Sequence, residues 1–186
     1  EGAAEGGGAV EGEGVAEGGG AVEGEGAAEG EGAVEGEGAA EGGGAVYIYE
    51  SKGINFSQCF FKLNEANNGG GIFIKNSDIN ISFTNCILWN NTANVIGGAF
   101  YTLSSDLNLT HCTNMDNSAN DITSPKGGGI YSQSSTLIIL NSIFWGNNAT
   151  SLPEISNEMS SLHITYSNID GGWEGVGNLN NGICNE

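Results

Sequence analysis

The sequence predicts an all-β protein, a parallel β-helix of about five coils with three short strands in each coil. Two observations carry this prediction. Within each short run, apolar residues alternate with polar ones, which is the strand period of two, and no 3.6-residue apolar stripe indicates helices. A short phrase also recurs at intervals of 27, 26 and 30 residues, and self-similarity at such a period indicates stacked repeats. The copies are Asn64-Glu-Ala-Asn67, Asn91-Thr-Ala-Asn94, Asn117-Ser-Ala-Asn120 and Asn147-Asn-Ala-Thr150.

Aligning the copies gives columns of equivalent residues and places three strands in each repeat. A glycine cluster and an apolar run follow each of the first three phrases, as in Gly69-Gly70-Gly71-Ile72. Further along, the alternation changes parity, and Asn is frequent there and tolerates left-handed backbone angles, so we expect a tight bend. The bend residues are Gln58, Asn85, His111, Asn141 and Tyr166. One strand therefore follows the glycines, one precedes the bend and one follows it, each stacked about 4.8 Å from its equivalent.

The residue after the bend defines a column of small side chains. This column contains Cys59, Cys86, Cys112, Ser142 and Ser167, and its last member reveals a fifth copy that lacks the Asn phrase. We expect the three cysteines to form an inward ladder of small apolar side chains, although stacked neighbours are also close enough for a disulfide. The chain has no Cys-x-x-Cys, which argues against zinc. Cys184 stands apart near the end.

The asparagines of the phrase predict two more columns. Stacked amides hydrogen-bond along the axis of cross-β structures, so a structural ladder is the favoured interpretation. The first column is Asn64, Asn91, Asn117 and Asn147, and the second is Asn67, Asn94 and Asn120.

These motifs resemble a known family. Phe61-x-x-Asn64 and Phe144-x-x-Asn147, with Gly-Gly-(Ala/Ile) sequences opening the next copy, are similar to the FxxN and GGA(I/L/V) repeats of polymorphic outer membrane proteins. The resemblance covers about residues 43–170, with degenerate copies at Leu88 and Asn114. It implies a right-handed parallel β-helix at the cell surface with a role in adhesion or display. The segment from Tyr166 to Asn178 is similar to the closing coil of secreted β-helix proteins.

Residues 1–46 differ from the rest of the chain. They consist largely of Glu-Gly-(Gly/Glu)-Gly-(Ala/Val)-(Ala/Val) hexapeptides and carry 12 of the 23 acidic residues without any Lys or Arg. Glycine at alternate places is compatible with a narrow β-solenoid that continues the stack, whereas the composition alone is typical of a flexible linker. We expect a first segment over 1–46 and a β-helix over 47–186, with a capping segment from about residue 171. Because the chain begins at Glu1 part-way through a repeat, we also expect a processed or longer protein.

Composition limits the functional classes. Four Lys, no Arg and a net charge of −19 argue against nucleic acid and against anionic membranes. No run of 18 apolar residues predicts a membrane span. The acidic residues outside the first segment are scattered and include turn positions, so we expect no catalytic residues and no metal site.

Two groups of surface residues remain as candidates. Asn-x-Ser/Thr sequons predict glycosylation if the source is eukaryotic. They stand at Asn55, Asn80, Asn90, Asn108 and Asn148. Trp89 and Trp145 share a column with Lys62 and Met115, and they either stack on sugars or a partner chain or simply cover the corner.

The expected function is that of a non-enzymatic, extracellular structural or adhesive protein at the cell surface, a component of a fibre or filament. We expect it to need no cofactor and to associate end to end with itself or with other surface proteins, with glycans as further partners. One alternative is a carbohydrate-active β-helix enzyme, which requires two carboxylates about 5–10 Å apart. The other is a calcium-stabilised acidic module with the Glu rows of residues 1–46 as ligands.

Overall fold

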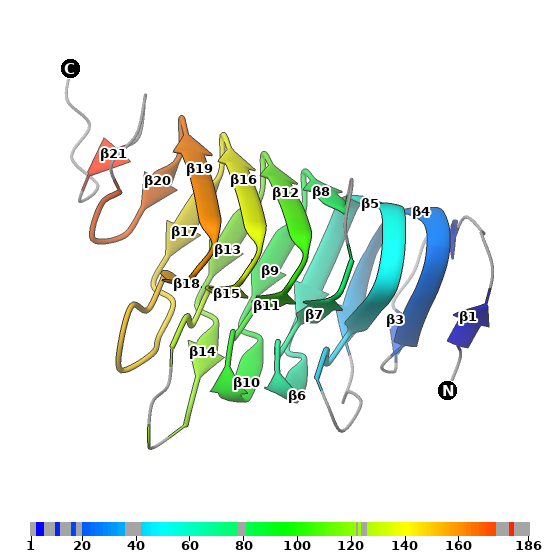
Figure 1. The fold of residues 1–186 in the computed structure, drawn as a ribbon, viewed down its shortest axis with the longest axis horizontal. Helices are drawn as coiled ribbons and strands as arrows, with labels where there is room; N and C mark the ends of the chain where they lie inside the picture. Colours follow the sequence, from blue (N-terminus) through cyan, green and yellow to red (C-terminus); the bar gives the residue numbers. More distant parts are fainter. Residues whose placement is uncertain are drawn as a thin grey trace.

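The computed structural model describes residues 3–5, 10–11, 16–17, 20–35, 42–77, 81–121, 123, 126–173 and 179–180, with side chains described from residue 42 to residue 173. These residues contain strands and no helix, and they form a parallel β-solenoid of about four turns (Figure 1). The expected parallel β-helix is confirmed, while the number of five coils and the right-handed winding stay predictions.

The strands are short except for two, β4 and β5. Their bounds are β1 (Ala3–Glu5), β2 (Val10–Glu11), β3 (Ala16–Glu17), β4 (Gly20–Glu35), β5 (Val46–Lys62), β6 (Glu65–Asn68), β7 (Ile72–Lys75), β8 (Ser82–Thr84), β9 (Ile87–Trp89), β10 (Thr92–Ile96), β11 (Phe100–Leu103), β12 (Asp106–Thr110), β13 (Thr113–Met115), β14 (Ser118–Ala119), β15 (Ile130–Gln133), β16 (Thr136–Leu140), β17 (Ile143–Trp145), β18 (Ile155–Glu158), β19 (Ser161–Thr165), β20 (Asn168–Ile169) and β21 (Leu179–Asn180).

Three parallel sheet faces run along the stack. The first face holds β7, β11, β15 and β18, the second holds β8, β12, β16 and β19, and the third holds β9, β13, β17 and β20. The long strand β5 pairs in turn with β7, β8 and β9, so it bends around two corners and belongs to all three faces. At the Asn-phrase corner, β6, β10 and β14 form a separate three-stranded sheet.

The first segment pairs with this stack through β4, which lies parallel to β5. Strands β1, β2 and β3 pair in turn with β4, and Ala3 lies opposite Ala21, Val10 opposite Ala28 and Ala16 opposite Val34. Each of these pairs is offset by three hexapeptides of the sequence. A narrow solenoid over 1–46 stays a prediction, because the residues between these strands lie outside the described part of the chain.

The corners begin with residues in the left-handed region, which confirms the predicted bend. Gln58, Asn85, His111, Asn141 and Tyr166 have φ of 58°, 56°, 55°, 51° and 52°. Two further corners of each coil do the same, at Asn76 and Ser104 and at Asn90 and Asp116 among others. A glycine is required where the chain leaves the Asn phrase, because a Cβ on Gly98 would stand 2.1 Å from the backbone oxygen of Gly128 in the next coil.

The interior is a column-by-column stack of apolar side chains. Phe61, Phe83, Phe100 and Phe144 are fully buried, and the ring of Phe83 stacks on that of Phe56 with centroids 4.7 Å apart. Two interior positions of one coil carry a different kind of side chain from their neighbours in the stack. The polar Asn114 lies between Leu88 and Phe144, and the aromatic Phe100 lies between Ile72 and Ile130. The larger Phe100 ring therefore enters the coil in which the third face has a smaller, polar side chain.

The C-terminal end of the stack is partly covered. Trp173 packs against the apolar core, and β21 pairs with β20. The rest of the expected capping segment, including Cys184, lies outside the described residues.

Candidate functional site: the corner ladders and an apolar outer face

The asparagines of the first predicted column form a continuous ladder of side-chain amides. Asn64 Nδ2 donates to Asn91 Oδ1 at 2.7 Å, Asn91 Nδ2 to Asn117 Oδ1 at 2.9 Å, and Asn117 Nδ2 to Asn147 Oδ1 at 2.9 Å. Each Oδ1 also accepts the backbone N–H of the asparagine one coil before it, at 3.1, 2.8 and 2.9 Å. All four side chains are buried. The ladder thus satisfies backbone donors that the left-handed bend turns away from the strand carbonyls.

The same amides also tie each coil to the strand of the preceding one. Asn91 Nδ2 donates to the Phe61 carbonyl and Asn117 Nδ2 to the Leu88 carbonyl, both at 3.0 Å. Each of these amides therefore links its own coil to the next asparagine of the ladder and to the end of a strand in the preceding coil.

The ladder ends on a carboxylate that the sequence did not reveal. Glu154 Oε1 accepts the backbone N–H of Asn147 at 3.1 Å, and Glu154 Oε2 accepts the Asn147 amide. Glu154 is 5% exposed. The sequence has no further Asn phrase after Asn147-Asn-Ala-Thr150, so this carboxylate takes the place of the missing asparagine.

Burial raises the pKa of Glu154 from 4.5 to about 7. The hydrogen bonds from Asn147 act in the opposite direction, while the charges of Asp170 and Asp116 raise the pKa further. Glu154 is therefore a buried carboxyl group that titrates near neutral pH at the end of an amide chain.

A second ladder, of serines, was also missed. The backbone N–H groups of Ser51, Ser77 and Ser105 donate to Ser77, Ser105 and Ser135 Oγ at 3.1, 3.0 and 3.1 Å, and Ser135 N–H donates to Ser160 Oγ at 3.0 Å. Each serine follows a left-handed residue, as each asparagine of the ladder does. The signal was present in the sequence as a small polar residue at a fixed place before the second strand.

The cysteine column occupies the third corner. Cys59, Cys86 and Cys112 are buried free thiols, and Cys112 and Ser142 continue the column with backbone N–H groups that donate to Ser142 and Ser167 Oγ, both at 3.1 Å. The neighbouring Cys112 thiol and burial raise the pKa of Cys86 to about 12. All three corners therefore follow one rule, in which a left-handed residue precedes a small side chain that faces the next coil.

The second asparagine column is placed differently. Asn67, Asn94 and Asn120 are exposed at the outer side of the corner, whereas the alanines between the two columns are buried and in register, Ala66 with Ala93 and Ala93 with Ala119.

The sequons differ in accessibility. Asn90 and Asn148 are exposed, whereas Asn55 and Asn108 are half-buried, and Asn55 Oδ1 accepts a hydrogen bond from Ser82 Oγ at 2.9 Å. Asn80 lies outside the described residues.

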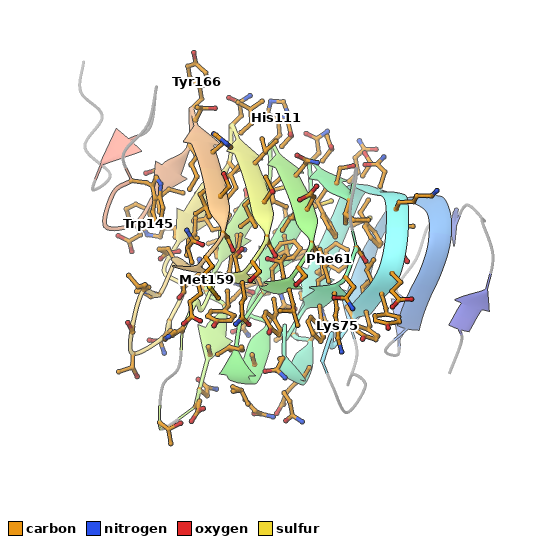
Figure 2. All side chains as sticks on the ribbon, viewed as in Figure 1. Phe61, Lys75, His111, Trp145, Met159 and Tyr166 are labelled. Carbon is orange, nitrogen blue, oxygen red and sulfur yellow. The ribbon has the colours of Figure 1, made fainter. Side chains whose placement is uncertain are left out.

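Outward side chains of the third face form a continuous strip, called here the apolar face. Its first column is Phe60, Ile87, Thr113, Ile143 and Asn168, and its second is Lys62, Trp89, Met115, Trp145 and, directly after Ile169, Asp170. Ile87, Trp89, Ile143 and Trp145 are 41%, 37%, 44% and 38% exposed. The structure therefore brings the two predicted tryptophans together on one surface, two coils apart, and Figure 2 shows Trp145 on the outside of the stack and Phe61 within it.

Contacts along the second column hold Trp89 in place. Its ring stacks on that of Phe60 with centroids 6.2 Å apart, and its Nε1 donates to Asp116 Oδ2 at 3.1 Å. Lys62 Nζ lies 5.9 Å from the Phe60 ring centroid. These contacts fix the position of the Trp89 ring on the outer surface.

A different aromatic stack lies outside the first face and is covered. Phe73 and Tyr101 stack with centroids 4.6 Å apart, and Tyr131 follows at 5.3 Å; all three are buried, with Ile96 packed on them. Burial and a hydrogen bond to Glu158 raise the pKa of Tyr131, and Glu158 also pairs with Lys126 at 2.5 Å. This stack packs Ile96 of β10 against the outer side of the first face.

Within the described residues, no group of three or more His, Cys, Asp or Glu side chains is arranged to hold a metal ion. The calcium hypothesis rests on the Glu side chains of residues 1–46, and these Glu side chains are not among those described. No helix in the described ranges is long and apolar enough to cross a membrane.

Comparisons with protein-family models, with curated proteins and with solved structures found no match to this chain. The fold assignment therefore rests on strand register and corner geometry.

Proposed function

We propose that this chain is a non-enzymatic structural and adhesive module at the cell surface, a component of an extracellular fibre or filament. The observation that carries the proposal is the Asn ladder from Asn64 to Glu154. The polar side chains that recur in every coil are engaged in hydrogen bonds between coils, which is the use expected in a scaffold. What varies from coil to coil is the outer surface.

The end of the stack supports end-to-end association. Among the described residues, β18 pairs with β15 on one side and with no strand on the other. Unpaired strand edges invite another strand, so a second copy or another surface protein is the expected partner. The resemblance to polymorphic outer membrane protein repeats, the right-handed winding and the five coils belong to this proposal.

Surface labelling of the source cells tests the proposed location. We expect an antibody against the purified chain to label intact cells and mild protease treatment to remove that signal. Labelling that requires permeabilised cells would contradict the proposal. Negative-stain electron microscopy of the full chain then tests end-to-end association, for which filaments that grow along the stack axis are expected.

The carbohydrate-active enzyme is the second candidate, and one observation favours it. Burial and the charges of Asp170 and Asp116 raise the pKa of Glu154, as is typical of a general acid near other carboxylates. However, both Glu154 oxygens accept hydrogen bonds from Asn147 and the side chain is buried, which favours the ladder role. A reducing-end assay over a panel of polysaccharides separates the two candidates, because product formation that Glu154→Gln abolishes would establish the enzyme.

A further inference from the structure

The residues of the apolar face are arranged nearly symmetrically about the middle of the stack, at Thr113 and Met115. Read along its second column, the residues are Lys62, Trp89, Met115, Trp145 and Asp170, and the first column reads Phe60, Ile87, Thr113, Ile143 and Asn168. Both columns repeat the same residue type on either side of the middle coil. The second column also begins with a positive charge and ends with a negative one.

This arrangement is self-complementary under one particular rotation. A two-fold axis that runs along β13, in the plane of the face, turns the stack end for end and brings the face onto itself. Trp89 then meets Trp145 of the second copy, Ile87 meets Ile143, and Met115 meets Met115. Lys62 at one end comes to lie over Asp170 at the other, and this pairing occurs twice.

The alternative two-fold axis, along the stack, lacks this match. It keeps the two stacks parallel and exchanges the two columns, so Lys62 meets Phe60 and Asp170 meets Asn168. Charge complementarity therefore selects the antiparallel arrangement.

We propose that two copies of this chain dock face to face and antiparallel through the apolar face, forming a closed isologous dimer. The proposal goes beyond the structural role, because face-to-face docking differs from end-to-end association and leaves the strand edge of β18 uncovered. It also gives the exposed Ile87, Trp89, Ile143 and Trp145 an apolar partner.

The size of the face sets the expected strength. The five residues of each column are separated by four steps of about 4.8 Å and so span roughly 19 Å, which is small for a specific interface. We therefore expect dissociation in about the micromolar range, and the net charge of −19 weakens association further at low salt.

Sedimentation velocity of the full chain, at salt near about 0.15 M and protein concentrations up to about 0.5 mM, tests the proposal. A monomer–dimer equilibrium is expected. Lys62→Asp and Asp170→Lys should each weaken the dimer at least about tenfold by placing like charges together, and the double exchange should restore it to within about threefold. Met115→Glu should abolish it, since it places two carboxylates together at the axis.

The matched control is Ile138→Glu, on the second face, because Ile138 is 46% exposed and is outside the apolar face. It should leave dimerisation unchanged, and circular dichroism should show that every variant keeps the fold. A monomer at every concentration, or a double exchange that dimerises no better than its single variants, would overturn the proposal. So would a monomer whose tryptophan fluorescence shifts with soluble glycans, because the face would then be a sugar-binding surface.

Discussion

The carboxylate of Glu154 accepts both the backbone N–H and the side-chain amide of Asn147, and so occupies the place that an asparagine holds in each preceding coil. The amides of the ladder all donate in the direction of Glu154. Such a chain polarises its members, and the two hydrogen bonds from Asn147 lower the pKa of Glu154 and so offset part of the increase that burial causes. The Asn ladder therefore ends on a defined acceptor, the Glu154 carboxyl group.

The ladder makes its central asparagines costly to remove. Asn91→Ala leaves the Asn64 backbone N–H, the Asn64 amide and the Phe61 carbonyl without their partner, so we expect a loss of roughly 3–5 kcal/mol of unfolding free energy. Asn94→Ala, three residues later at an exposed position, should change it by less than about 0.5 kcal/mol. Urea unfolding of the two variants measures the difference, and equal losses would refute the ladder's importance.

Glu154 should make stability depend on pH in a defined window. Its pKa is raised from 4.5 to about 7 in the folded state, so its contribution is fully present below about pH 4.5 and is lost as pH rises to about 7. Each pKa unit is about 1.4 kcal/mol, which gives an upper limit of roughly 3 kcal/mol.

Glu154→Gln isolates this effect, because a single amide oxygen accepts both Asn donors in the preceding coils. The difference in unfolding free energy between the original chain and the variant should grow in favour of the variant from pH 4.5 to pH 7. A difference that stays constant across this window would show that Glu154 is ionised in both states.

How far the sequence predicts the fold depends on which interactions repeat. The Asn and Cys columns and the left-handed bend residues recur at nearly constant spacing, so each is visible without coordinates. The serine ladder recurs equally well, but serine is common in loops and carries no strong local signal. Glu154 could not be predicted, since it is a single substitution at the end of the stack where the phrase is missing.

The exposure of outward-facing side chains is harder to predict from the sequence than the interior columns. Phe73, Tyr101 and Tyr131 alternate outward, which suggests exposure, yet they are buried because they stack on one another and because strand residues such as Ile96 pack against them. The column that contains Trp89 and Trp145 could be predicted from the sequence alignment of the repeats. Its charge pattern could not, because it depends on the position of Asp170 beside Trp145. A hydrogen bond of 2.9 Å from the Asp170 N–H to the Phe144 carbonyl fixes that position.

Asn114 should be replaceable by leucine with a gain in stability. Its Nδ2 is buried without a partner, and it stands in a column with Leu88 and Phe144. Leucine has nearly the same shape, and Asn117 Nδ2, which donates to Asn114 Oδ1, keeps other acceptors. We expect Asn114→Leu to add about 1–2 kcal/mol in urea unfolding, with Leu88→Asn as the opposite change. A destabilised Asn114→Leu variant would mean that the amide has an unrecognised partner.

Cys86 should tolerate serine because serine already fills this column in later coils. Cys86 Sγ donates to the Thr84 carbonyl, as Ser142 Oγ does to the Leu140 carbonyl at 2.9 Å. Cys86→Ser should cost less than about 1 kcal/mol, whereas Cys86→Val, which lacks the donor, should cost about 1–3 kcal/mol. Thermal unfolding of both variants checks the order, and a more stable valine variant would contradict it.

Hydrogen exchange of the side-chain amides tests the central claim, the buried Asn ladder, most directly. In ¹⁵N-resolved NMR spectra of the full chain in D₂O, the Nδ2 protons of Asn91, Asn117 and Asn147 should exchange as slowly as the most protected backbone amides, while those of exposed Asn94 should exchange within the first spectrum. Exchange of the Asn91 and Asn117 amides as fast as that of Asn94 would contradict the ladder and, with it, the corner rule that orders the stack.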